Sequence, residues 1–291
     1  MNKKVLAGVG AAGGAIALIL GGQVLVSHAA TKELDKAIAE VADYVDIDYQ
    51  KVETSFFSRT GRVKDITLSP VGSNEQYKAD ELVVKKYEEK DSIPTAVNMA
   101  IKGIQLDSAL LGNDTDMFKE LGYEGDISMN IATDYAYEAD QQALTLKSVK
   151  VGADQLGDFD LNLHLEKVDL SEEMMASFPF SLLSAEFHGA KITYKDDSFI
   201  TRMFDTAAAA NGVSVEDFKK EAIASLKDDP EIAAVLTDEQ RQEIEKFINN
   251  PKGFAISMSP AEPVPFSAVM TASAGGPTAI AELLAVQFKA D

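Results

Sequence analysis

The sequence predicts an α+β protein: an N-terminal transmembrane helix followed by a mostly antiparallel, curved β-sheet body with helices packed on it. Over residues 46–195, apolar and polar residues alternate with a period of two, which is typical of half-buried strands. Over residues 196–250, apolar residues recur at a spacing of three or four, as on one face of a helix. Because the strands come first and the helices follow, the order favours an antiparallel sheet over alternating βαβ units.

The composition allows a sizeable core. The 291 residues suffice for one large or two modest domains, and 46% of them are hydrophobic. The chain contains no Cys and no Trp. The absence of Cys excludes disulfides, thiolate metal sites and Cys nucleophiles, but it does not define the compartment.

Residues 1–29 are predicted to be a membrane anchor or signal segment. Lys3 and Lys4 precede an uncharged run over residues 5–26, whose 22 residues as a helix span about 33 Å, enough to cross a bilayer core. Because a secretory apolar region is usually shorter, about 7–15 residues, the length favours an uncleaved anchor. Cleavage after Ala29 remains an alternative, as does a buried helix of a soluble protein. The positive-inside rule places the two lysines in the cytoplasm and the body on the other side of the membrane.

Residues 30–45 are expected to form an amphipathic stalk helix. Its apolar residues Leu34, Ile38, Val41 and Val45 fall on one helical stripe. The body follows, over residues 46–291. Its expected parts are a strand-rich segment 46–195, a helix-rich segment 196–250, and a segment 251–291 with a strand, short helices and a last strand at 285–289.

Turn residues and glycines delimit the expected strands. The segment SRTG at 58–61 predicts the turn of a first hairpin. Two further strands are expected over 77–89 and 95–107, and a change of face near Gly103 indicates a β-bulge. The clearest half-buried strand is 159–166, where Phe or Leu at each odd position alternates strictly with a polar residue.

Capping residues delimit the expected helices. Thr237 precedes Gln240 by three residues, which predicts a full capping box, and Ser214 precedes Asp217 in an imperfect one. An earlier helix is expected to be capped by Asp197 or Ser198.

A short line of similar residues occurs four times. The four segments 63–69, 101–107, 165–171 and 189–195 each contain Ile or Val, a polar residue, and then Leu or Tyr. We interpret each as a strand that ends in a turn or helix. Internal duplication and chance recurrence both remain open.

The three histidines are candidate catalytic or metal-binding residues, but the sequence assigns none of them such a role. His28 lies at the membrane boundary, His164 lies on the polar face of the strictly alternating strand, and His188 ends a strand before Gly189. No HExxH or HxH spacing occurs. A histidine metal site is therefore not expected.

Acidic residues are abundant but do not define a site. Asp114, Asp116 and Glu120 lack the spacing of a calcium loop, and acidic residues at a helix N-terminus explain them better. A pair of carboxylates in a hydrolase remains an alternative, which the lack of Trp sugar platforms disfavours. The body contains no GxSxG, GxxxxGK[ST] or GxGxxG motif, so the sequence predicts no catalytic residue and no cofactor.

The charge of the body argues against nucleic-acid binding. Residues 30–291 contain 47 acidic and 25 basic residues, and no cluster of Lys and Arg interrupts the acidic surface. Such a body repels nucleic acid and anionic lipid headgroups.

Two segments of the chain resemble the YdgA-like and AsmA-like envelope proteins of Gram-negative bacteria. The resemblance rests on Phe56-Phe57-Ser58, on VKDITL at 63–68 and on DFDLNLHLEKVD at 158–169, and it covers about residues 1–70 and 125–170. It implies an inner-membrane anchor, a periplasmic domain and a role in envelope maintenance or lipid handling. It implies no catalytic residue, and the helical stretch 198–250 has no counterpart in it.

We therefore expect a non-enzymatic, single-pass envelope protein held in the membrane by residues 5–26. Its body is expected to bind a lipid, another hydrophobic ligand or an envelope protein. The alternatives are a structural or assembly protein without a ligand, and a carboxylate-dependent hydrolase. The sequence leaves the oligomeric state open.

Overall fold

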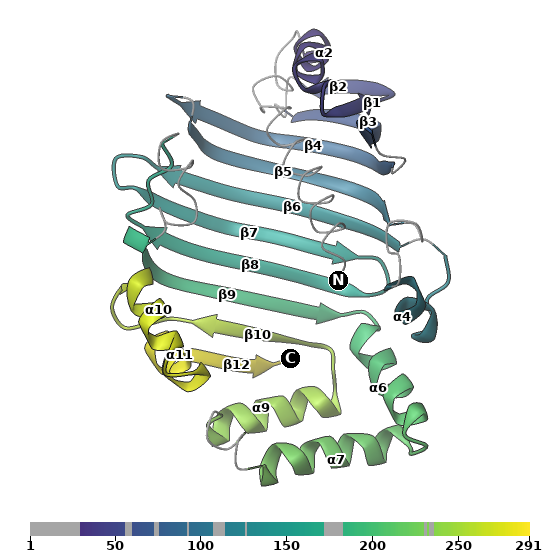
Figure 1. Ribbon diagram of the computed structural model, residues 1–291, viewed down its shortest axis with the longest axis vertical. Coiled ribbons are helices and arrows are strands. Elements are labelled where there is room, and N and C mark those ends of the chain that lie inside the picture. Colours follow the sequence, from purple (N-terminus) through teal and green to yellow (C-terminus); the bar gives the residue numbers. More distant parts are fainter. Residues whose placement is uncertain are drawn as a thin grey trace. The chain divides into compact units, whose positions relative to one another are not determined.

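The protein is described from a computed structural model (Figure 1). The described residues are 30–55, 60–72, 76–91, 93–106, 114–125, 127–171, 183–229, 232 and 236–291. The expected anchor and the possible cleavage site after Ala29 lie outside them. Within the described ranges, no helix is long and apolar enough to span a membrane. The described part is an α+β fold with an open, mostly antiparallel sheet, which confirms the expected fold class of the body.

The chain divides into two compact units, whereas the sequence suggested one body. Unit 1 consists of Met1–Tyr135 and Lys150–Asp154, and unit 2 of Ala136–Val149 and Gln155–Asp291. The division passes through two neighbouring strands, β6 (Ile127–Glu138) and β7 (Ala143–Ala153), which contribute to both units.

Unit 1 is a small sheet with an N-terminal helix. Its other elements are α2 (Ala30–Val41), β1 (Val45–Asp48), β2 (Lys51–Ser55), β3 (Thr60–Pro70), β4 (Tyr77–Lys90), β5 (Ile93–Leu106) and α4 (Asp114–Glu120). The strand order is β1-β3-β4-β5-β6, with β2 also paired to β3. The long strand β3 pairs antiparallel with β2 along its first half and with β1 along its second half.

Helix α2 packs on the core of unit 1 through the first part of the predicted apolar stripe. The helix ends at Val41, so Val45, which was expected in the helix, instead begins β1. Leu34 is only 1% exposed and belongs to one buried cluster with Val63 of β3 and Leu82 of β4. The polar side of the same helix is held by Tyr49, whose hydroxyl donates a 2.6 Å hydrogen bond to Asp35. Burial, this hydrogen bond and the charge of Asp35 together raise the pKa of Tyr49 to about 12.

Gly103 does not form the β-bulge that the sequence suggests. The register of β4 and β5 is the same on both sides of Gly103, and the register shifts of this pair lie farther along, within residues 84–89 of β4. Gly103 has a φ of 65°, and an added Cβ there would lie 2.0 Å from Oδ2 of Asp80. Its N–H donates to Oδ1 of Asn130 on β6 at 3.1 Å. The glycine is therefore required by the close approach of the Asp80 side chain to the backbone.

Unit 2 contains the second half of the strands and most of the helices. Its further elements are β8 (Gly157–Glu166), β9 (Glu186–Asp196), α6 (Phe199–Ala210), α7 (Val215–Asp228), α9 (Asp238–Asn249), β10 (Gly253–Met258), β11 (Val264–Pro265), α10 (Phe266–Ser273), α11 (Pro277–Leu283) and β12 (Val286–Ala290). The strand order is β7-β8-β9-β10-β12, with β11 also paired to β9.

Helix α9 covers the outer edge of β12, as Figure 1 shows. The predicted capping box is present, because Thr237 and Gln240 each accept a hydrogen bond from the other's backbone N–H. The side-chain amide of Gln240 also donates a 3.0 Å hydrogen bond to the carbonyl of Val286 on β12. The carboxylate of Glu243 accepts a 3.0 Å hydrogen bond from the N–H of Ala290 on the same strand. Side chains of α9 thus form hydrogen bonds with backbone groups of the edge strand β12, and these groups are then not available to pair with another chain.

The start of α6 differs from the expected one. Ser198 occupies the N-cap position but makes no side-chain cap bond, and its hydroxyl donates instead to the carbonyl of Gln155. The side chain that satisfies the helix start is Asp196, whose Oδ1 accepts a 2.8 Å bond from the N–H of Ile200. The side chain that caps α6 is therefore that of Asp196, and not that of Asp197 or Ser198 as expected.

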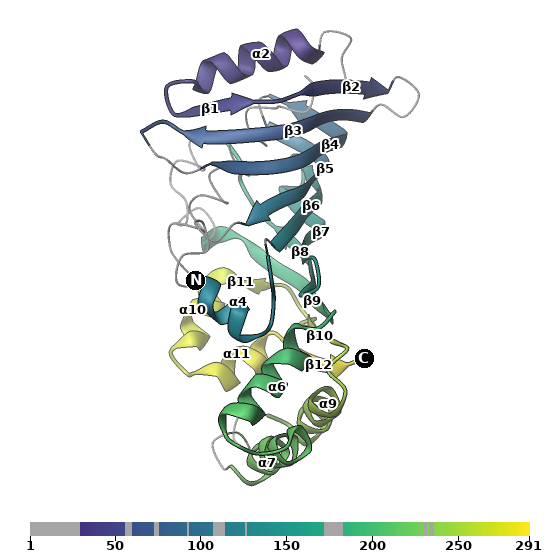
Figure 2. The same ribbon diagram turned by 90° about the vertical axis from the view of Figure 1, so that its right-hand side faces the viewer.

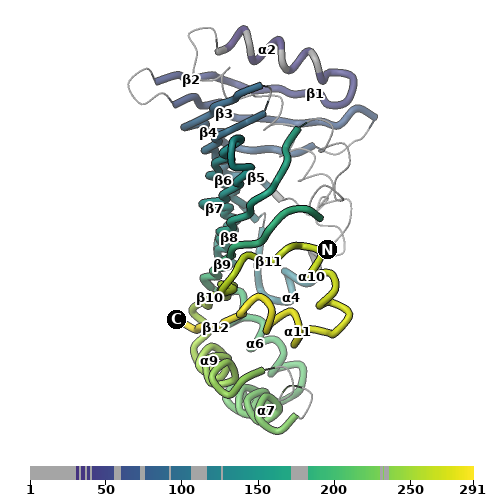
Figure 3. Tube along the Cα trace, turned by 90° about the vertical axis from the view of Figure 1, so that its left-hand side faces the viewer, coloured from purple at the N-terminus to yellow at the C-terminus, as the bar shows by residue number. Residues whose placement is uncertain are grey.

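The sheet of unit 2 has one apolar and one polar face. On the apolar face, Leu163 and Leu165 of β8 and Phe187 of β9 belong to one cluster with residues of α10 and α11. Figures 2 and 3 show these two helices lying against this part of the sheet. The strict alternation of β8 directs Asp160, Asn162, His164 and Glu166 to the opposite face.

Candidate functional site

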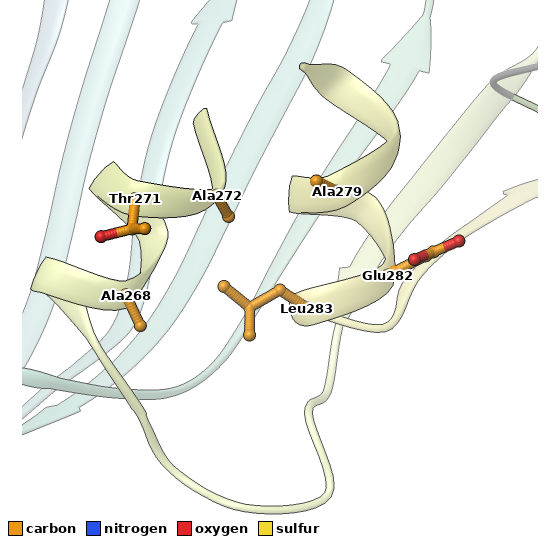
Figure 4. A pocket seen from close by; sticks show the side chains of 6 residues that line it. All are labelled: Ala268, Thr271, Ala272, Ala279, Glu282 and Leu283. Atoms are coloured by element: carbon orange, nitrogen blue, oxygen red, sulfur yellow. The ribbon is translucent and has the colours of Figure 1, made fainter. Parts of the chain in front are cut away.

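An apolar groove lies between the short helices α10 and α11, with a volume of about 640 Å³. Its lining residues are Ala268, Thr271, Ala272, Ala279, Glu282 and Leu283. Figure 4 shows Leu283 reaching from α11 toward Ala268 and Ala272 of α10, whereas Glu282 extends away from α10. The volume is within the range of small-molecule sites, about 300–1,000 Å³.

Local sequence explains why the groove forms. Gly276, with a φ of 87°, and Pro277 at the first helical position reverse the chain between the two helices. The start of α10 is fixed to the sheet because the N–H of Phe266 donates to the carbonyl of Ala185. Three of the six lining residues are alanines, whose short side chains leave open space where larger residues would interdigitate.

A second candidate site lies on the polar face of the sheet, where β8 and β9 bring together His164, Glu166 and His188. One ligand atom from each of the three lies within 4.8 Å of the other two. His164 Nε2 is 3.6 Å from Glu166 Oε1, and His188 Nε2 is 3.2 Å from Glu166 Oε2. The two imidazole rings meet edge to face, with centroids 4.9 Å apart.

The structure brings together two histidines that no sequence motif joins. The sequence placed His188 at the end of a strand, but it is the third residue of β9, which continues through Gly189 to Asp196. His28 lies outside the described residues. Sequence reasoning missed this cluster because it depends on the pairing of β8 with β9. No short sequence motif relates Glu166 on β8 to His188, which lies 22 positions later on β9.

The acidic residues singled out in the sequence form no described cluster. Residues 114–120 form α4, and Glu120 at its end is exposed. The side chains of Asp114 and Asp116 lie outside the described part.

Three carboxylates have a lowered pKa, whereas a general acid needs a raised one. A carboxylic acid that donates a proton in catalysis has a raised pKa, as burial provides. Hydrogen bonds from Lys51 and Lys64 lower the pKa of Glu53, and a hydrogen bond from Ser214 lowers that of Asp217. Lys246 and the backbone of Ala290 lower the pKa of Glu243. The lowered pKa favours the ionised form of these three carboxylates, which does not suit a general acid.

Comparison with known proteins finds a family match over the second half of the chain. Residues 150–291 match a family described as "Uncharacterized protein". No curated protein matches the chain. The matched span contains both the groove and the cluster of His164, Glu166 and His188, as well as the helical stretch 198–250.

Proposed function

We propose that the protein is a non-enzymatic, single-pass protein of the bacterial cell envelope whose body binds a lipid acyl chain between α10 and α11. The observation that supports ligand binding is the groove lined by Leu283 and three alanines. When an apolar ligand displaces water from an apolar surface of this kind, the free energy of the system falls, which favours binding.

The membrane part of the proposal rests on residues 5–26. A helix there would keep the body beside a bilayer, so acyl chains would be the most abundant apolar ligands within reach. The resemblance to YdgA-like and AsmA-like proteins supports the inner membrane as the site of the anchor and the periplasm as the location of the body.

Ligand binding is tested with the full chain in bacterial inner-membrane vesicles that contain a photoreactive fatty acid. After illumination, mass spectrometry of peptides identifies the labelled segments, and we expect labels within residues 266–283. The variants Ala272→Phe and Ala279→Phe fill the groove and should lose this labelling. Ala209→Phe, on the exposed side of α6, is the matched control and should retain it. Labelling that is absent, or that is unchanged by filling the groove, would refute the lipid site and favour a structural or assembly role.

Anchoring is tested separately on protein isolated from cells. We expect the full chain to resist extraction from membranes by alkaline carbonate, and its body to be digested by protease only once the outer membrane is opened. An N-terminal sequence that begins at Ala30 would show cleavage after Ala29 and refute the anchor, whatever the result for the groove.

A further inference from the structure

The cluster of His164, Glu166 and His188 has the donor set of a metal site. Two imidazole nitrogens and one carboxylate are ligands that Zn²⁺ binds, and three protein ligands leave a coordination position open for water. His164 and Glu166 are two residues apart on β8, so both side chains project from the same face of the sheet.

His188 reaches this face because the pairing of β8 with β9 is irregular at this point. His164 pairs with Gly189, but the next residue of β8, Leu165, pairs with Phe187. His188 is therefore the extra residue of a β-bulge, a feature that re-aims side chains and is frequent beside functional sites.

A ring nitrogen of His188 lacks a hydrogen bond. Its Nε2 is buried although the side chain as a whole is 24% exposed, and within the described residues this atom makes no hydrogen bond. Oε2 of Glu166 lies 3.2 Å away, but not in hydrogen-bond geometry. A buried polar atom without a partner costs free energy, and natural proteins rarely retain one without a reason. A metal ion bound to both Nε2 and the Glu166 carboxylate would supply the missing bond.

A tetrahedral ion sets the distances between its ligand atoms. Two ligand atoms bound at about 2.0–2.1 Å from a tetrahedral Zn²⁺ lie about 3.4 Å apart. His164 Nε2 lies 3.6 Å from Oε1 of Glu166 and His188 Nε2 lies 3.2 Å from Oε2, so the two imidazoles approach different oxygens of the carboxylate. One ligand atom from each of the three residues lies within 4.8 Å of the other two. Binding one ion would therefore draw the three ligand atoms inward, to separations of about 3.4 Å.

The surroundings of the cluster position its ligands. Nδ1 of His164 is 3.0 Å from Oγ1 of Thr145 on β7. When Nδ1 donates this hydrogen bond, the lone pair of Nε2 is directed toward Glu166 and is free to bind a metal. The adjacent carboxylate of Glu186 is held by Lys167, so it is engaged elsewhere.

From these observations we propose that His164, Glu166 and His188 form a Zn²⁺ site with one open coordination position for water. The side chains of His164 and Glu166 are each 40% exposed, so an ion can enter from solvent. The net charge of −20 raises the local concentration of cations around the protein. This inference is independent of the lipid groove.

The test uses the full chain in detergent, without a histidine tag, and titrates it with Zn²⁺ in competition with a chromophoric chelator. We expect one Zn²⁺ per chain and an increase in thermal stability, because a metal that binds only the folded state stabilises it. Co²⁺ should replace Zn²⁺ and show the intense visible absorption of a tetrahedral nitrogen–oxygen site.

The variants separate a metal site from a network of ion pairs. His188→Ala and Glu166→Gln should weaken Zn²⁺ binding by more than about 100-fold, and Thr145→Val by about 10–100-fold. The matched control is Glu186→Gln, which removes an equal charge from the facing position and should leave the affinity unchanged. Wild-type protein that binds no Zn²⁺, or variants that all bind as tightly as the control, would refute the site. Far-UV circular dichroism confirms that each variant is folded.

Discussion

Replacing Gly103 by Ala tests whether the close approach of Asp80 shapes the centre of unit 1. The new methyl group would lie 2.0 Å from Oδ2, 2.3 Å from Cγ and 2.8 Å from Cβ of Asp80. The oxygen could rotate away, but Cβ is fixed to the backbone of β4, so strands β4 and β5 must separate slightly. The bond from Gly103 N–H to Asn130 on β6 would be disturbed by the same movement.

The expected magnitude has two parts. A left-handed φ costs an L-residue roughly 1–2 kcal/mol, and forcing an extra methyl group into a filled space costs about 1–3 kcal/mol more. Gly72→Ala is the matched control, because Gly72 also has a positive φ, 79°, but has no atom within 4 Å of an added Cβ. Both variants lose the same glycine entropy in the unfolded chain. The difference between them, about 1–3 kcal/mol in the free energy of unfolding, therefore measures the close approach alone.

The assay is urea unfolding followed by far-UV circular dichroism, because the chain has no Trp for fluorescence. Asp80→Ala removes two of the three atoms that collide with the new methyl group. The double variant should therefore be more stable than the sum of the two single changes predicts. If Gly103→Ala costs no more than Gly72→Ala, or if the double variant is strictly additive, the reasoning from the close approach is wrong.

Three further predictions concern residues that stabilise each unit by itself. Leu34→Ala should lower the free energy of unfolding by about 2–5 kcal/mol in urea titrations, because Leu34 is fully buried between α2 and the sheet. Thr237→Ala should cost about 1 kcal/mol by the same assay through loss of the capping box, whereas Thr237→Ser should cost little. Because the folded state raises the pKa of Tyr49 from 10.0 to about 12, its contribution is complete below pH 10 and is lost as pH rises toward 12. Tyr49→Phe should remove this part of the alkaline loss of stability, and an unchanged pH profile would contradict the assignment.

The sequence determined the features that depend on residues close together in the chain. The alternation of residues 159–166 placed Leu163 and Leu165 on the buried face of β8 and His164 on the opposite face, as observed. The capping box at Thr237 required only a residue three positions later. Strand and helix boundaries of this kind follow from local geometry, since a period of two or a capping hydrogen bond is a property of a short segment.

Only the tertiary structure determined which distant residues meet. The sequence placed His164 and His188 on separate strands and gave no reason to join them, because their meeting depends on the pairing register of β8 with β9 and on a one-residue bulge. Likewise, the groove of Figure 4 depends on how two short helices pack on the sheet, and the requirement for Gly103 depends on the position of Asp80 across the strand pair. Register and packing are set by many weak contacts between segments far apart in the chain. A change of one residue in register exchanges the faces of a whole strand, so no local pattern fixes these features.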